Sequence, residues 1–460
     1  MLARPEIDKE FSILSANLKS SRIEGIERDI AEFITAFDVF ESMDKPYVTA
    51  QLLMLDTDNI LEDMDFQGGE TIDFRMQNMM LTEAMHIVEK TFVISKLIRS
   101  RKTNQNVEVY NLHLIERHAF KSDLVNVNKA YRGSPSNIIS EILEGFLEKE
   151  VWVSDDEFQD NIKLIVPNMH PLEGCQWIKD HTTNKDGFPF YFFSTFNTNF
   201  LYLISLGFML GNKPQNKDNP FVYSQQGMNF SFTNQQKMYG VQNYSHVDND
   251  DLPNLIRSGD IASEYIFHNT ANNISKIINH NVIEDLVTLT DDYLPTPANS
   301  VTYGVGLNMD GKQLEEYQSR KIFKVCSTGA YDDGDGKGYK SLGEETQRDS
   351  YKKQSSAKAL KNLSLKNPIS IQVDGKHFLN GDDNYTLGQT IRVIFLSSSP
   401  AGHGAGSTDT LIDNKKSGDY LIYATRHMFK DERYDIKLFC IKLAHYTSQD
   451  LGSYLKVGSA

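Results

Sequence analysis

The sequence is poor in cysteine, and its cysteines are too scattered to form a pair or a metal site. Cys175, Cys326 and Cys440 lie far apart, and no Cys-x-x-Cys motif occurs. Disulfide frameworks and structural zinc sites depend on paired or closely spaced cysteines, so the spacing argues against both. We therefore expect a protein that folds in a reducing compartment.

Long apolar runs are also lacking. The most apolar stretch, residues 188–210, is interrupted by Pro189 and by several Ser, Thr and Asn residues. A bilayer-spanning helix needs about 20 predominantly apolar residues, so we expect a buried hairpin here and no membrane span. The beginning of the sequence lacks a basic segment followed by an apolar stretch and a cleavage site, so we expect no secretory signal.

Positive charge is scarce as well. The chain has 47 Lys and Arg residues against 62 Asp and Glu residues, which gives a formal net charge of −15. The basic residues are dispersed, and only Arg99, Arg101 and Lys102 cluster. Because nucleic-acid binding depends on basic surfaces that neutralise phosphates, we expect no sequence-specific nucleic-acid partner. Solubility alone also explains a negative balance.

Motifs for metal or phosphate binding are absent. The acidic loop Asp332–Gly336 offers clustered carboxylates, but with Asp333 and Asp335 as the first two ligands, the next position of a calcium loop is Lys337, a cation. A solvated loop is the better interpretation. Glycines at 334, 336 and 338 and at 402, 404 and 406 lack the flanking strand, helix and lysine of a phosphate-binding loop.

Catalytic motifs are absent too. The sequence contains neither GxSxG nor HExxH, and Cys175 lies in an apolar helical stretch typical of a buried residue. Acidic pairs at 155–156 and 382–383 are explained by turns and caps, and histidines 113, 118, 427 and 445 fall in or beside predicted strands. We therefore predict no enzyme, no catalytic or cofactor-binding residue, no cofactor and no metal ligand.

What the sequence does contain is the composition of a large folded protein. Of its 460 residues, 40% are hydrophobic and 24% are charged, which is typical of globular chains and not of disordered or fibrous ones. A chain of this length usually divides into units of roughly 100–200 residues. We expect about three or four such units.

Strand-length runs of alternating polar and apolar residues fill both ends of the chain. The N-terminal set comprises residues 32–40, 47–55, 71–77, 90–99 and 107–117, and the C-terminal set comprises residues 369–374, 391–396, 420–427 and 436–443. Each set could close into a small β-barrel.

The middle of the chain has mixed patterns. We predict a helix after Ser134, a strand over 162–166, a helical stretch around Trp177 and then the aromatic hairpin. Residues 212–251 are expected to be an exposed connection, 261–268 a strand, 274–289 a helix, 331–343 a Gly-rich loop and 344–363 a polar helix.

These patterns give a mainly β fold with an α+β insertion. The predicted domains are an N-terminal arm with the first barrel, an α+β insertion, a connecting region that could complete the first barrel, and a second barrel with its preceding loop and helix. Their bounds are residues 1–117, 118–211, 212–330 and 331–460.

Four segments, taken in order, resemble the baseplate hub proteins of contractile-tailed bacteriophages, a family that includes the hub part of type VI secretion spikes. The order of these segments carries the resemblance, and the helix followed by the aromatic hairpin is its most specific feature. The segments are the strands of 33–55 with Gly68-Gly69-Glu70 and TIDFRMQ; NKAYRGSPSNIISEIL at 128–143; LIVPNMHPLEGCQW at 164–177 with GFPFYFFSTFNTNF at 187–200; and 369–388 with SGDYLIYATRH at 417–427.

The resemblance implies a structural hub that adapts a hexameric tail tube to a trimeric central spike. Two barrels per subunit would alternate in a homotrimer and form a pseudo-sixfold ring. The implied partners are further copies of the chain, the spike, tail tube or tube-initiator proteins, the tape measure protein and baseplate wedge proteins. The implied location is the virion tail baseplate, assembled in the bacterial host cytoplasm.

Two other functions stay open at the level of sequence. A tail-associated hydrolase that degrades the cell wall would need a catalytic constellation that no segment supplies. A receptor-binding tail component would also be β-rich and trimeric, but fibrous receptor binders usually have shallow repetitive strands, which this sequence lacks.

Overall fold

The computed structural model of the protein describes most of the chain. It describes residues 9–20, 22–64, 66–80, 86–104, 107–154, 161–223, 239–246, 252–269, 274–282, 284–285, 308–325, 330–332, 339–341, 350–365, 368–381, 386–396, 413 and 416–442.

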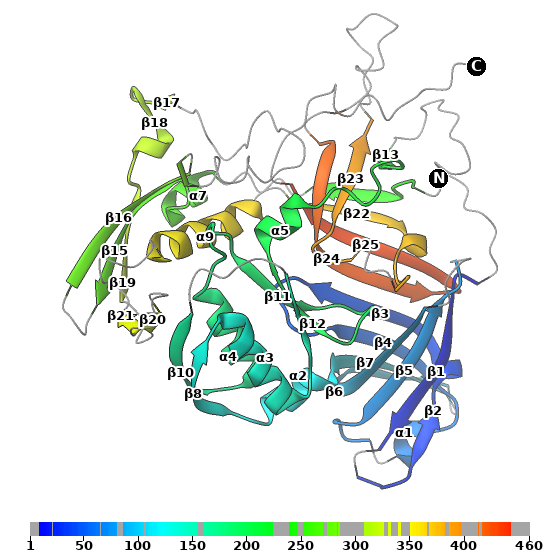
Figure 1. Ribbon diagram of the computed structural model, residues 1–460. Helices are drawn as coiled ribbons and strands as arrows, with labels where there is room; N and C mark the ends of the chain where they lie inside the picture. Colours follow the sequence, from blue (N-terminus) through cyan, green and yellow to red (C-terminus); the bar gives the residue numbers. More distant parts are fainter. Residues whose placement is uncertain are drawn as a thin grey trace, which may run out of the picture.

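A single sheet of thirteen strands dominates the structure (Figure 1). Its main path has the strand order β14-β22-β25-β24-β3-β4-β7-β6-β5-β1-β2. Off this path, β23 pairs with β24 and β13 pairs with β23. Its N-terminal strands are β1 (Phe11–Lys19), β2 (Glu27–Asp29), β3 (Ile34–Ser42), β4 (Thr49–Asp56), β5 (Thr71–Asn78), β6 (Ile87–Asn104) and β7 (Val107–Glu116). The remaining strands are β13 (Phe221–Tyr223), β14 (Asn243–His246), β22 (Ile369–Asp374), β23 (Thr390–Phe395), β24 (Gly418–Lys430) and β25 (Arg433–Ile441). The prediction of a mainly β protein is confirmed.

The two ends of the chain meet inside this sheet, and its described strands do not show the closure of the two barrels that the sequence predicts. Residues 36–42 of β3 pair antiparallel with residues 424–430 of β24. Among the described strands, both sets therefore belong to one path that runs from β14 to β2. Alternation within a strand shows which residues are buried, but it does not show which strand lies next to it.

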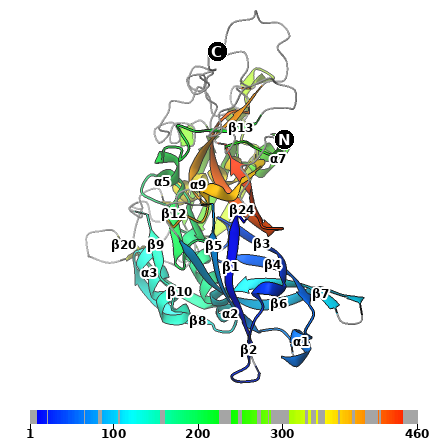
Figure 2. The same ribbon diagram turned by 90° about the vertical axis from the view of Figure 1, so that its right-hand side faces the viewer.

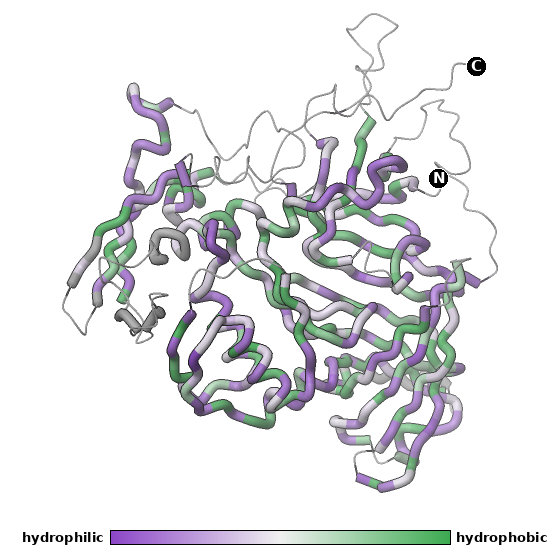
Figure 3. The backbone as a smooth tube through the Cα atoms, viewed as in Figure 1, coloured by the Kyte–Doolittle hydropathy of each residue, from purple (hydrophilic) through white to green (hydrophobic). Residues whose placement is uncertain are grey.

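The sheet curls around an aromatic core. Phe37 of β3 stacks on Phe74 of β5 with a centroid separation of 4.6 Å, although these strands are not hydrogen-bonded neighbours. Glu10 accepts a backbone hydrogen bond from Met79 and donates one to Glu432, so the start of β1 contacts the β24–β25 turn. Hydrophobic and hydrophilic residues alternate along the strands (Figure 3), and β6 and β7 extend beyond the other strands (Figure 2).

The segment after β7 forms the predicted α+β unit. It contains α2 (Arg117–Asp123), β8 (Val127–Gly133), α3 (Pro135–Ile142), a π-helical turn (Leu143–Leu147), β9 (Val151–Val153), β10 (Ile162–Met169), α4 (Pro171–Asp180), β11 (Phe190–Ser194), β12 (Leu201–Ser205) and α5 (Leu206–Gly211). Ser134 caps α3 by accepting a hydrogen bond from the amide of Asn137 at 3.3 Å. Strands β11 and β12 are buried throughout and form the predicted aromatic hairpin.

A smaller sheet at the left of Figure 1 corrects one prediction. It consists of β16 (Ile274–Asn281), β15 (Ala262–Asn269) and β19 (Arg320–Val325), and α7 (Leu252–Ser258) and α9 (Ser350–Ser364) lie beside it. The helix predicted over 274–289 is wrong, because the first half of that segment is β16, paired with β15 along its length. Pairing with a neighbouring strand outweighs weak local helical periodicity.

Two segments predicted as loops contain strands. Within the 212–251 connection, β13 and β14 join the large sheet, and Phe221 is fully buried. At the predicted loop 331–343, β20 (Ala330–Asp332) and β21 (Tyr339–Ser341) pair with each other, and β20 extends the β8–β10 sheet. The strand over 261–268 is confirmed as β15, and the polar helix is α9.

Short elements complete the described chain, and none of its helices is long and apolar enough to cross a membrane. The short elements are α1 (Ile60–Asp63), β17 (Asn308–Met309), β18 (Lys312–Gln313) and 3₁₀ turns at Ala31–Phe33, Leu314–Glu316 and Gly375–His377.

The aromatic core gives a direct stability prediction. Phe37→Ala removes a fully buried ring, and we expect it to cost roughly 3–5 kcal/mol of unfolding free energy because the cavity cannot close. The control Phe120→Ala, at a ring that is 36% exposed, should cost less than about 1 kcal/mol. The denaturation midpoint of the far-UV circular dichroism signal measures both. Equal midpoints for the two variants would contradict the assigned core.

Candidate functional site

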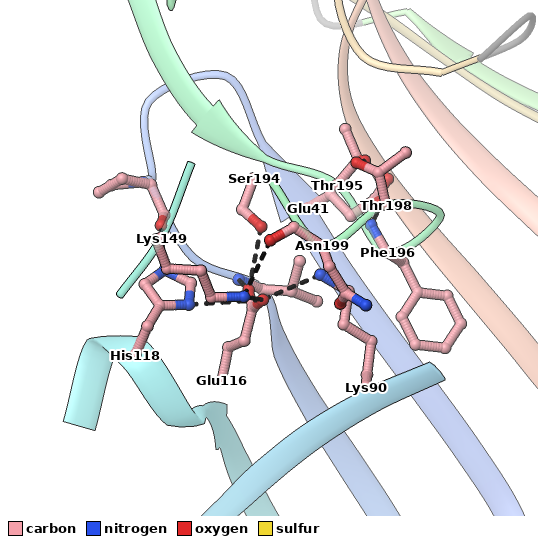
Figure 4. A network of polar contacts seen from close by, with 12 residues as sticks. Glu41, Lys90, Glu116, His118, Lys149, Ser194, Thr195, Phe196, Thr198 and Asn199 are labelled. Carbon is pink, nitrogen blue, oxygen red and sulfur yellow. Dashed lines mark hydrogen bonds and ion pairs between the residues drawn. The ribbon is translucent and has the colours of Figure 1, made fainter. Parts of the chain in front are cut away.

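A buried polar network joins the α+β unit to the large sheet (Figure 4). Its centre is Glu116, the last residue of β7, whose side chain is 3% exposed. Lys90 of β6 donates to Glu116 Oε1 at 2.9 Å. Glu116 Oε2 accepts from the amide of Val48 at 3.1 Å and from the hydroxyl of Ser194 at 3.0 Å. Strands β6 and β7, the residue before β4 and the aromatic hairpin therefore meet at one carboxylate.

Two further basic residues face the same carboxylate from the α+β unit. His118 of α2 lies with Nδ1 3.4 Å from Glu116 Oε1, and Lys149 lies with Nζ 3.8 Å from it. His118 Nε2 is 2.7 Å from the carbonyl of Pro46, which can only accept, so this nitrogen carries a proton. Lys149 also donates to the carbonyl of Asn199 at 2.9 Å. These contacts fix α2 and the hairpin loop against the sheet.

The electrostatics keep this carboxylate ionised. Burial by itself raises the pKa of Glu116, but the charges of Lys90, His118 and Lys149 hold that pKa well below its ordinary value of 4.5. Burial lowers the pKa of the Lys149 amine, and this effect exceeds the opposing attraction of Glu116. A carboxylate that stays charged and fully hydrogen-bonded is a poor proton donor, so the network is suited to holding segments together.

A second buried carboxylate anchors the other end of the same hairpin loop. Glu41 of β3 accepts hydrogen bonds from the amide of Phe196 and the hydroxyl of Thr425. His427 of β24 lies with Nε2 3.1 Å from Glu41, and its Nδ1 is 2.7 Å from the hydroxyl of Tyr434. Burial by itself raises the pKa of Glu41. His427 and the hydrogen bonds lower that pKa by a larger amount, so the net shift is downward. Loop 194–199 is thus held by two buried carboxylates.

A cavity of about 540 Å³ opens beside the Glu116 network. Its wall includes Lys90, Glu116, His118 and Lys149 together with the charged side chains Asp73, Arg75, Glu89, Arg117, Lys121 and Glu148. Several of these are already paired, with Arg75 to Glu89 and Lys121 to Glu148 both at 2.8 Å. Because charges of both signs compensate each other here, the cavity does not select a ligand by charge.

The candidate residues that the structure describes lie in different elements. Cys175 is buried in α4, where burial raises the pKa of its thiol. His113 lies in β7, while the acidic loop around Asp333, both glycine runs, the acidic pairs at 155–156 and 382–383, and His445 lie outside the described residues. In the part of the chain that the structure describes, no group of three or more His, Cys, Asp or Glu side chains could hold a metal ion.

Sequence reasoning overlooked the network although a signal for it exists. Lys90 occupies the inward phase of β6, between buried Val88 and Phe92, and Glu41 continues the inward phase of β3 after Phe37 and Val39. A charged residue at the buried phase of an alternating strand must find a partner, so it indicates an interior ion pair. The partner itself cannot be read from the strand.

Comparisons with known proteins gave matches to solved structures, whereas comparisons with protein-family models and with curated proteins gave none. A tail protein from Neisseria meningitidis aligns at 12% identity and a TM-score of 0.47, covering 93% of this chain and 96% of that chain. The 43 kDa tail protein of prophage MuSo2 from Shewanella oneidensis aligns at 10% identity and a TM-score of 0.47, covering 94% and 100%.

A third match is an E. coli component of the type VI secretion system, described as structurally similar to the T4 bacteriophage tail proteins gp27 and gp5. It aligns at 9% identity and a TM-score of 0.40, covering 94% of this chain and 78% of that chain. These neighbours are described as tail proteins and as a component of a secretion system.

Removing the central carboxylate should destabilise the joint. Glu116→Gln leaves Lys90 buried without its counter-charge, and we expect a loss of roughly 3–5 kcal/mol. The matched control Glu89→Gln removes an exposed partner of Arg75 and should change stability by less than about 1 kcal/mol. Both tryptophans, Trp152 and Trp177, lie in the α+β unit, so their fluorescence reports its detachment during denaturation. Coinciding curves for both variants would rule out an anchoring role.

The same carboxylate predicts a pH dependence. Because the folded-state pKa of Glu116 is lowered, its contribution to stability is complete above about pH 4.5 and is lost as the pH falls through the folded-state value. Glu41 acts in the same direction. The stability difference between wild type and Glu116→Gln should therefore narrow on acidification below pH 4.5, as followed by denaturation at a series of pH values. A difference that stays constant would contradict the assignment.

Proposed function

We propose that this chain is a structural subunit of a phage tail or of a related contractile injection machine. More specifically, we propose the baseplate hub, which adapts a hexameric tail tube to a trimeric central spike. The observation that carries the proposal is the ordered resemblance of four segments to hub proteins, from the early strands to SGDYLIYATRH at 417–427. The confirmed aromatic hairpin, its most specific segment, supports it.

The arrangement of the large sheet agrees with such a role. Seven strands precede the α+β unit and six follow it, and the two sets lie on either side of the β3–β24 pairing. A homotrimer would place six such half-sheets around one axis, which is the number that a hexameric tube presents. We propose that each set contributes one barrel of this pseudo-sixfold ring, because closure protects sheet edges.

The remaining parts of the proposal follow from this role. The protein would be non-enzymatic, with its domains divided at residues 117, 211 and 330, and it would reside in the tail of the virion. Its partners would be other copies of itself, the spike, tube or tube-initiator proteins, the tape measure protein and the wedge proteins. The Glu116 network agrees with a structural role, because its contacts with Ser194, His118 and Lys149 hold the α+β unit on the sheet.

The mass of the purified chain in solution tests the proposal. Light scattering should give about 157 kDa, three times the 52.3 kDa of one chain, and the assembly should co-elute with a trimeric spike from the same tail. A stable monomer that ignores spike and tube proteins but degrades cell-wall material would overturn the proposal in favour of a hydrolase. A trimer that binds host-surface material instead of spike would favour a receptor-binding component.

A further inference from the structure

The large sheet has an open edge along the second half of β6, in the part of the hairpin that extends beyond the other strands (Figure 2). Strand β5 pairs with β6 as far as Val93, and Ile94 still exchanges backbone hydrogen bonds with Gly69 and Glu70. From residue 96 to residue 104, β6 pairs only with β7 among the described strands. The unused backbone donors and acceptors along such an edge can accept a further strand.

Strand β24 is built in the same way, but its edge is occupied. Its residues 418–421 pair with β23, and residues 424–430 then pair with β3 on the same side. On the other side it pairs with β25, and the register shifts at residues 422–424, where the pairing with β23 has ended. Strand β6 has the same irregularity at residues 94–96, where its pairing with β5 has ended. Each strand therefore leaves its own set at a bulge, and the freed edge of β24 takes β3.

The strand that corresponds to β3 and has a free edge is β14. Strand β3 lies at one end of the run β3-β4-β7-β6, and β14 lies at the same end of the run β14-β22-β25-β24. Among the described strands, β14 pairs only with β22, so its outer edge is open too. Within one chain, six strands of the path separate β14 from β6. A β14 strand that reaches the edge of β6 therefore comes from another copy.

We propose that the open edge of β6, residues 96–104, pairs antiparallel with β14 of a second copy of this chain. The junction between copies then repeats the β24–β3 junction within each copy. This inference rests on the proposed function, in which copies surround one axis. Because two different edges meet, the contact is heterologous, and repeated heterologous contacts close into rings. Three copies have three internal and three intermolecular junctions of one kind, as a pseudo-sixfold ring requires.

The internal junction predicts which residue of β6 receives the new strand. Met428 of β24, in the third ladder pair from the β24–β25 turn, lies opposite Asp38 of β3. The third ladder pair from the β6–β7 turn contains Arg101. Arg101 therefore occupies on β6 the position that Met428 occupies on β24.

Rows across the two runs give the matching position on β14. In each run we take the row that contains the first residue paired beyond the bulge. In the N-terminal run this row is Asp38, Gln51 and His113. In the C-terminal run it is Ser245, Ser370 and Phe439. Ser245 therefore occupies the position of Asp38, and we expect it opposite Arg101 of the neighbouring copy.

The charges in the sequence favour β14 over a second β6 as the partner. The segment SKLIRSRKTN at 95–104 contains four basic residues and no acidic residue. Strand β14, NYSH at 243–246, contains no Lys or Arg, and VDNDD with three aspartates follows it at 247–251. Two β6 edges paired with each other would bring two basic segments together, and like charges on paired strands are destabilising.

A pair of introduced cysteines tests the contact. In Arg101→Cys/Ser245→Cys, oxidation should link neighbouring copies, because directly opposite residues on antiparallel strands lie within reach of a disulfide. A denaturing gel without reductant should show a covalent trimer of about 157 kDa, three times 52.3 kDa. The matched control is Asp38→Cys/Met428→Cys, the same register at the internal junction, and it should link within one chain. Lys96→Cys/Ser245→Cys, displaced along β6, should give at least tenfold less covalent trimer.

Each outcome discriminates. A protein that is trimeric in solution but does not link through positions 101 and 245, although the internal control links, overturns this inference alone and leaves the hub proposal standing. Equal linking of the displaced pair also overturns it, because the contact is then not in this register. A 101–245 disulfide within one chain, seen as a monomer band without the introduced thiols, excludes a second copy as the partner. A monomeric wild type that ignores spike overturns the hub proposal and this inference together.

Discussion

The pairing of β3 with β24 is the constraint on which the rest of the structure depends. It joins strands that are separated by nearly the whole chain, since Phe40 lies opposite Arg426 and Phe37 opposite Phe429. Such a long-range contact carries a high cost in chain entropy, which the buried aromatic core beneath it offsets. The strands before and after the α+β unit become one sheet only because this pair forms.

Two buried carboxylates lie at different places relative to that pairing. Glu41 and His427 lie at the joint itself, whereas Glu116 and Lys90 lie where the α+β unit meets the sheet. Both carboxylates reach the short hairpin loop through Phe196 and Ser194. Buried ion pairs contribute little net stability compared with apolar packing, but a mispaired alternative leaves charges stranded. We infer that these networks specify how the parts dock.

One face of the small sheet of β15, β16 and β19 is apolar and exposed, unlike the buried charged networks. Its ion pair, Lys321 with Glu264, is at the margin, and its centre is apolar and exposed. Elsewhere in the described chain, apolar surface is closed by aromatic packing and charge is buried in pairs. On this sheet, Ile277, Phe323 and Val325 instead remain exposed in the single chain.

The sequence by itself determined the β-rich character, the position of the α+β unit and its aromatic hairpin, because these follow from alternation, capping and local hydrophobic runs. It did not determine that β3 meets β24, or that Lys90 meets Glu116, because the partner of a strand or of a buried charge is chosen by the tertiary fold. The segment beginning at Ile274 shows the same limit, since pairing with β15 made it a strand where local spacing predicted a helix. Local sequence patterns selected the helices and strands. Only the three-dimensional packing decided which strands pair and which of their faces become buried.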